Sequence, residues 1–183
     1  PLYSVGMVRA INEIGFKPKM IGGGMVGLQF TAIKQQLGPL LNGFVNYETW
    51  LPAKTMQYPG VLDLVAKYQE RAKGEKVDPL GYYLPPWAYA YLQVLEQAVS
   101  ATKSLDDDKL ADYIRKNTFN TVVGDVKFGS DGEWTESRFL QVQFQNIGGT
   151  DIKEFTDMSK QPILAPANLK TGEVIYPFEK ARK

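Results

Sequence analysis

Residues 81–134 read GYYLPPWAYAYLQVLEQAVSATKSLDDDKLADYIRKNTFNTVVGDVKFGSDGEW, and the organisation of the chain is best understood outward from this stretch. A helical pattern runs over residues 86–101, and Pro85 and Pro86 stand where a helix can begin, because proline fits the first turn but not the interior. The apolar positions that recur at helical spacing are Tyr91, Leu95, Ala98, Val99 and Thr102.

The second half of this stretch predicts a shorter helix, a strand and a turn. Ser104 is the expected cap of the helix, and residues 106–108 place three aspartates against the positive end of its dipole. Residues 121–128 are typical of a strand, and residues 129–132 of a tight turn. This scaffold carries neither a nucleophile–base pair nor a metal-ligand cluster in its sequence.

The composition limits the classes of function. The chain has 183 residues, of which 44% are hydrophobic, so it can bury a core in one domain or two small ones. The net charge is +1, from 21 basic and 20 acidic residues, so no nucleic-acid partner is expected. With no cysteine and no histidine, thiol chemistry, Ser-His-Asp triads and ordinary zinc sites are excluded, and the sequence predicts a protein that is not an enzyme.

Before this stretch, the pattern alternates between helix and strand. The expected elements are a helix at 1–14 with Leu2, Val5, Val8, Ile11 and Ile14 as its apolar stripe, a strand at 19–22, a glycine loop at 22–24, a helix at 28–37 and a strand at 43–48. Short connections of this kind indicate an α/β fold with parallel strands. Two strands are too few for such a sheet, so others are expected elsewhere in the chain, in a partner or in a missing segment.

The remaining segments are simpler. Residues 53–60 are predicted to be a linker, residues 61–72 a helix and residues 138–147 a strand. After Gly148 the pattern weakens, and an extended loop is expected up to the end of the chain.

The glycine loop is the strongest enzyme-like motif. Residues 22–27 read GGGMVG, which satisfies G-x-G-x-x-G, and Glu48 ends the next strand where a ribose-binding acid would stand. An NAD(P)-dependent oxidoreductase is therefore one alternative. Against it, a helix precedes the motif, the strand is very short, and no catalytic group follows. The other interpretation is that the glycines let the chain turn sharply at the carboxyl end of a strand, where open α/β sheets bind ligands.

Other candidate residues have a structural and a functional interpretation. The aromatic cluster formed by Tyr82, Tyr83, Trp87, Tyr89 and Tyr91 is either core packing or a stacking wall for a ring. The aspartates at 106–108 lack the ligand spacing of a calcium loop, so no metal is expected. Glu133 and Glu136 are expected to be exposed turn residues rather than a glycosidase pair. Trp50, just after a strand, is a candidate for the wall of a cleft.

Four local patterns together resemble a known family. They are AINEIGFKPKMIGGG at 10–24, LNGFVNYETWLP at 41–52, AYAYLQVLEQAVSATKSLD at 88–106 and NTVVGDVKFGSDGEW at 120–134. Their order and spacing resemble the C-terminal half of a type I periplasmic solute-binding protein, the leucine/isoleucine/valine-binding group of ABC importers. Gly129 departs from the family pattern, since many members have aspartate there.

The resemblance implies a two-lobed fold with parallel sheets flanked by helices, joined by hinge crossovers. Residues 1–52 would belong to the second lobe and residues 53–130 to the C-terminal part of the first lobe. Residues 131–183 would hold the return crossover, a second-lobe strand and the C-terminal tail. Crossovers are expected near 50–54 and 128–136, and the missing N-terminal half would complete both lobes.

The resemblance also implies the function. Such proteins are periplasmic after removal of a signal peptide, close on a small-molecule ligand by hinge motion, and dock on an ABC importer permease in the inner membrane. No cofactor is expected. A ligand-sensing receptor domain uses the same fold and is a further alternative.

Five residues are the expected ligand contacts. Gly23, Gly24 and Met25 form the loop, Trp50 a cleft wall, and Tyr3 a weaker candidate at the start of a second-lobe helix. Amino-acid-binding relatives carry an acidic residue where Gly24 stands, and a buried ammonium without a counter-charge is costly. An aromatic or other organic acid is therefore expected rather than a branched-chain amino acid.

Overall fold

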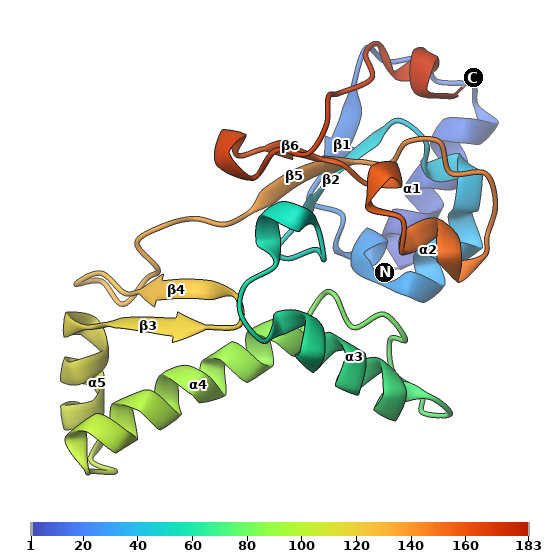
Figure 1. The fold of residues 1–183 in the computed structure, drawn as a ribbon. Helices are drawn as coiled ribbons and strands as arrows, with labels where there is room; N and C mark the ends of the chain where they lie inside the picture. The colour runs from blue at the N-terminus through green and yellow to red at the C-terminus, as the bar shows by residue number, and fades with distance from the viewer. Residues whose placement is uncertain (1, 183) are drawn as a thin grey trace.

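The computed structural model describes residues 2–182, whose helices and strands form two groups, one above the other in Figure 1. The upper group contains α1 (Leu2–Glu13), β1 (Ile21–Gly23), α2 (Thr31–Leu37), β2 (Phe44–Glu48), β5 (Leu140–Gln143) and β6 (Ile163–Ala165). The lower group contains α3 (Val61–Ala72), α4 (Pro85–Thr102), α5 (Asp107–Lys116), β3 (Thr118–Thr121) and β4 (Gly124–Lys127). The chain passes down after β2 and returns before β5, so the segments expected to be crossovers lie within these two connections.

The upper sheet has the strand order β1-β2-β5-β6, with α1 and α2 on one side of it in Figure 1. The α/β class is confirmed, but only β1 and β2 pair in parallel, while β5 runs antiparallel to both β2 and β6. The reason is the connection: α2 carries the chain back between β1 and β2, whereas β5 enters the sheet from the lower group. The expectation of a loop after Gly148 was wrong at β6, whose three residues are too few to leave a periodic pattern.

Helix α1 buries Val5, Val8 and Ile11 as predicted, but Leu2 and Ile14 at the two ends of the stripe are 82% and 74% exposed. A spacing of three residues falls short of a full turn, so a stripe built on it drifts around the helix. The ends of the stripe therefore turn away from the core.

Helix α4 begins at the predicted prolines but buries a different face. Its buried residues are Pro86, Ala90, Val94 and Ala98, whereas Tyr91 is 72% exposed. The helix has apolar residues on two faces, and the periodicity of the sequence does not distinguish them.

The strand predicted at 121–128 is confirmed over residues 124–127 as β4, but Thr121 belongs to β3, which pairs with β4 in an antiparallel hairpin that was not predicted. Val122 and Val123 make the turn, and both are buried. The Thr121 hydroxyl donates to the Gly124 carbonyl at 2.7 Å, and the Val122 amide donates to Gln93 at 2.8 Å. Side-chain hydrogen bonds thus hold a turn that two valines would not form alone.

The cap of α5 also differs from the prediction. The Asp106 carboxylate accepts from the Lys109 amide at 3.0 Å, while the Ser104 hydroxyl only accepts from the Asp106 amide. Across residues 2–182, no helix is both long enough and apolar enough to span a bilayer.

Candidate functional site

The glycine loop lies at the carboxyl end of β1, beside the neighbouring strand β2. Gly22 pairs with Val45, and a Cβ atom at Gly22 would lie 2.8 Å from the Val45 Cβ and closer still to the Val45 carbonyl oxygen. Glycine is therefore required at this position. Gly23 and Gly24 are exposed, and a Cβ at Gly24 would meet only the Tyr47 ring, at 3.8 Å. The loop thus presents an open edge of backbone next to a tyrosine.

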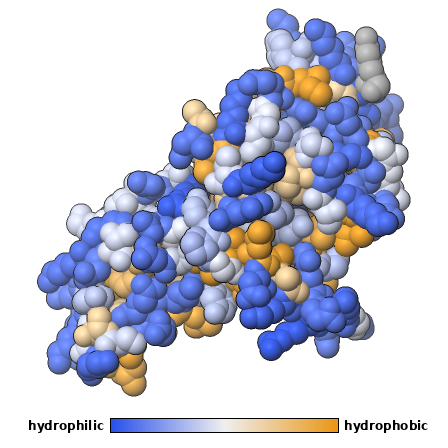
Figure 2. Space-filling model, viewed as in Figure 1, coloured by the Kyte–Doolittle hydropathy of each residue, from blue (hydrophilic) through white to orange (hydrophobic). Residues whose placement is uncertain are grey.

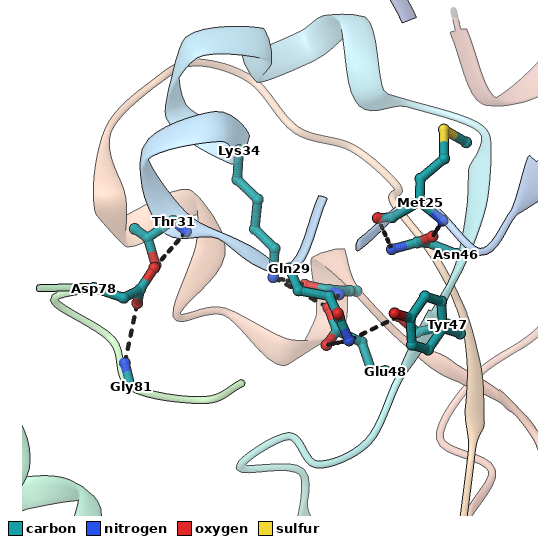
Figure 3. Close-up of polar contacts among 10 residues, drawn as sticks. Met25, Gln29, Thr31, Lys34, Asn46, Tyr47, Glu48, Asp78 and Gly81 are labelled. Atoms are coloured by element: carbon teal, nitrogen blue, oxygen red, sulfur yellow. Dashed lines mark hydrogen bonds and ion pairs between the residues drawn. The ribbon is translucent and has the colours of Figure 1, made fainter. Parts of the chain in front are cut away.

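Asn46, in the middle of β2, fixes the end of this loop (Figure 3). Its side chain is fully buried, accepts from the Met25 amide at 3.0 Å and donates to the Met25 carbonyl at 3.2 Å. This residue was missed from the sequence, although an amide in an otherwise apolar strand is a signal that a partner must be found for it.

Glu48, at the end of β2, is the centre of a buried polar network drawn in Figure 3. Its carboxylate lies 3.3 Å from the Lys34 ammonium, and the two side chains are 2% and 3% exposed. Gln161 donates to the same carboxylate at 2.9 Å and Gln29 at 3.3 Å, while Lys34 also donates to Gln161 at 3.2 Å. We call these four residues the Glu48 network. It joins β2 to α2 and to the C-terminal segment.

Two observations argue against the oxidoreductase alternative, one on Glu48 and one on the glycine loop. Glu48 is committed to the Glu48 network and cannot face a ribose. The loop does not open into an α-helix, because residues 26–29 form a single 3₁₀ turn and α2 begins only at Thr31. The amino terminus of α2 is bound by Asp78, which accepts from the Thr31 amide at 2.7 Å and from its hydroxyl at 2.8 Å.

A row of aromatic rings continues from the glycine loop toward the connecting segments. Tyr47 and Phe139 meet edge to face with ring centroids 5.7 Å apart, and Phe30 and Tyr83 do so at 5.5 Å. Burial raises the pKa of the Tyr47 phenol, and the neighbouring Tyr83 and Glu48 raise it further. Tyr47 is therefore neutral near pH 7, and its ring packs against Phe139.

Next to this row lies a cavity of about 550 Å³, which we call the crossover cavity. It is lined by Thr49, Tyr83, Leu84, Trp87, Glu133, Trp134, Glu136, Ser137, Arg138 and Phe139. Both connecting segments and the start of α4 thus form its walls. Its size suits a small organic molecule. Figure 2 shows apolar atoms at the surface where the upper and lower groups meet.

The structure places the predicted site residues in three different surroundings. Gly23, Gly24 and Met25 lie together at the open loop, and their contact with a ligand stays a prediction. Tyr3 is 95% exposed near the start of α1, and its role also stays a prediction. The prediction that Trp50 forms a cleft wall was wrong. Trp50 has no exposed surface, packs against Tyr82 and donates to the Met56 carbonyl at 3.2 Å, so it belongs to the core.

The remaining candidates behave as structural residues. Glu133 and Glu136 are exposed, as expected. Asp106 is the cap of α5, and within residues 2–182 no cluster of three or more acidic side chains is arranged to hold a metal ion.

Comparison with known proteins gives consistent matches. The sequence model of the periplasmic binding protein family matches residues 4–148. Leu/Ile/Val-binding protein homolog 2 of Brucella abortus (strain 2308) is 28% identical over 141 residues, covering 76% of this chain and 35% of that protein. The protein of the same name in Brucella abortus biovar 1 (strain 9-941) matches equally. The chain thus spans about a third of the length of these curated relatives.

Two solved structures share the fold. A leucine-binding protein from Thermotoga maritima has a TM-score of 0.61 at 23% identity, over 78% of this chain and 38% of that one. An extracellular ligand-binding receptor from Desulfohalobium retbaense has a TM-score of 0.52 at 16% identity, over 76% and 23%.

Proposed function

The chain belongs to the periplasmic binding protein family, and from that premise we propose that it is the C-terminal part of an extracytoplasmic protein that captures a small organic ligand between two lobes. The upper group and the lower group are then parts of the second and first lobe, and the N-terminal half completes both. The ligand is delivered to the permease of an ABC importer, and no chemical step takes place. The observation that carries the proposal is the crossover cavity, whose walls come from both connections between the two groups. The Tyr47 ring links it to the glycine loop, because Tyr47 lies next to Gly24 and meets Phe139 of the cavity wall edge to face.

The residues of the glycine loop also favour one class of ligand over another. No carboxylate side chain lies within residues 22–25, and the nearby carboxylate of Glu48 is already paired with Lys34. A ligand ammonium at this loop would therefore lack a counter-charge, which is costly in a closed cleft. We propose an organic acid, with an aromatic ring suited to the Tyr47 and Phe139 row, rather than a branched-chain amino acid.

The test is a thermal-shift panel on the full-length protein that carries this chain. The panel contains aromatic carboxylates, keto acids, leucine and NADP. A ligand at about a hundred times its dissociation constant stabilises the native state by roughly 2.7 kcal/mol, which is easily detected. A shift with an organic acid and none with leucine is expected. Unchanged unfolding temperatures across the panel would overturn the proposed function.

A matched variant tests the argument from Gly24. We expect Gly24→Glu to give a measurable shift with leucine while weakening binding of the organic acid, because the new carboxylate pairs with an ammonium and repels an acid. Gly24→Gln is the control, since it adds the same bulk without the charge. Equal behaviour of the two variants would remove the electrostatic argument.

A further inference from the structure

Two residues that line the crossover cavity each carry a buried polar atom without a hydrogen-bond partner. Within residues 2–182, only three buried side-chain polar atoms are in this condition, namely Gln29 Oε1, Thr49 Oγ1 and Trp87 Nε1. Thr49 and Trp87 both line the crossover cavity, although they are 38 positions apart in the sequence. Since buried polar groups are nearly always paired in folded proteins, two unpaired ones in one cavity indicate that something else binds there.

The walls around these atoms are aromatic. Trp87 and Trp134 meet edge to face with ring centroids 5.2 Å apart, and Tyr83 and Phe139 line the same space. Aromatic walls favour a ring as the body of the ligand, because offset and edge-to-face arrangements bury much area in a defined geometry.

A positive charge lies on the same wall. The Arg138 guanidinium stacks over the Trp134 ring at 4.8 Å and donates to the carbonyls of Val123 and Asp125 at 2.6 and 2.8 Å. Arg138 takes part in no ion pair among the described residues, so these carbonyls position the guanidinium without cancelling its charge. The lining also holds two carboxylates, those of Glu133 and Glu136, and both belong to exposed residues.

We propose that the crossover cavity holds the aromatic ring of a ligand whose carboxylate accepts hydrogen bonds from Trp87 Nε1 and Thr49 Oγ1. The indole N–H is a donor only, so its partner must be an acceptor, and the threonine hydroxyl can supply a second donor. Both atoms are almost inaccessible, so small rotations of the two side chains accompany binding, as is common at binding sites. This inference rests on the proposed function and names the ligand contacts within it.

The experiment measures affinity by isothermal titration calorimetry on the full-length protein, with benzoate, phenylacetate and benzylamine as probes. Benzylamine has the same ring but offers donors and no acceptor. We expect the aromatic carboxylates to bind and benzylamine to bind at least tenfold more weakly. Quenching of tryptophan emission is expected with them, because two of the three tryptophans line the crossover cavity.

Three variants locate the contact. Trp87→Phe and Thr49→Val remove a donor while keeping a ring or a similar volume, and each should weaken binding of the carboxylates by about tenfold. Tyr91→Phe is the matched control, because it also removes a donor and keeps a ring on helix α4, but Tyr91 is 72% exposed and lies outside the lining of the crossover cavity. It should change affinity less than about threefold. Unchanged circular dichroism and unfolding temperature establish that each variant is folded.

The outcomes separate this inference from the proposed function. Equal affinities of Trp87→Phe and Tyr91→Phe for benzoate, or benzylamine binding as tightly as benzoate, overturn the assigned contacts and leave a solute-binding protein. Binding of a keto acid with no aromatic probe also overturns the inference while the proposed function stands. Binding of leucine alone overturns both the inference and the proposed ligand class, and leaves only capture of a small solute. No binding by any member of the wider panel overturns both.

Discussion

The Glu48 network and the crossover cavity adjoin each other, but they differ in whether their buried polar side chains have partners within the chain. In the Glu48 network, side chains from positions 29, 34, 48 and 161 find each other, and only Gln29 Oε1 is left without a partner. In the crossover cavity, aromatic rings surround an open space, and two buried polar atoms remain unpaired. The difference teaches that the buried charges of the first region are paired within the chain, whereas the second region is arranged for an external partner.

The largest expected effect comes from breaking the ion pair of the Glu48 network. Lys34→Met leaves the Glu48 carboxylate buried without its counter-ion, and loss of one partner from a buried pair typically costs about 3–5 kcal/mol. We expect a loss of that size in the free energy of unfolding, measured by urea denaturation with tryptophan emission as the signal. The double variant Lys34→Met with Glu48→Gln removes both charges and should recover more than half of the loss. A loss below about 1 kcal/mol in the single variant would contradict the assignment.

The same substitution at two tryptophans compares a buried indole N–H that has a partner within the chain with one that has none. Trp50 Nε1 has a partner in the Met56 carbonyl, whereas Trp87 Nε1 has none. Trp50→Phe should therefore lower the free energy of unfolding by about 1–3 kcal/mol more than Trp87→Phe, because only the first change leaves a buried group unpaired. Equal losses in urea denaturation would show that ring volume, and not the hydrogen bond, determines the effect.

Several elements of the fold could be predicted from local sequence. Helix α3 has the predicted bounds, and α4 begins at the prolines that marked it, because helix periodicity and proline geometry depend on neighbouring residues. The loop at 22–24 was placed at the end of a strand for a similar reason, since three consecutive glycines fit only a turn or a close approach.

The functional contacts did not follow from local sequence. Glu48 was a candidate for binding a ribose in the oxidoreductase alternative, because its position in a strand says nothing of Lys34 or Gln161, and Gln161 lies 113 positions away. Trp50 was placed on a cleft wall because an aromatic residue after a strand has the same pattern whether it turns outward or into the core. The pairing of Thr49 with Trp87 in one cavity is likewise a product of the two connections, which no spacing rule describes.

A smaller effect is expected at the glycine loop. Gly22→Ala would drive a methyl group into Val45, and overpacking of this kind costs about 1–3 kcal/mol. Gly24→Ala meets only the Tyr47 ring at 3.8 Å, so its unfolding free energy should change by less than about 0.5 kcal/mol. Denaturant titration of the two variants gives the comparison. Equal stability would mean that β1 can move away from β2, and the loop would not be fixed as described.

The smallest effect concerns a second ion pair, which differs from Lys34–Glu48 by being partly exposed. The hydrogen bond from Lys160 lowers the pKa of Glu154 below its usual 4.5, and the Gly148 amide at 2.6 Å lowers it further. A carboxyl group whose pKa is lower in the folded than in the unfolded state binds fewer protons when folded. Its contribution to stability is therefore present above pH 4.5 and is lost as the pH falls through the lower, folded pKa. Glu154→Gln should abolish this part of the acid dependence of the urea midpoint and change the midpoint little at pH 7. If the urea midpoint falls with acid in the same way in the variant and in the original chain, the partly exposed Lys160–Glu154 pair does not contribute to stability as the fully buried Lys34–Glu48 pair does.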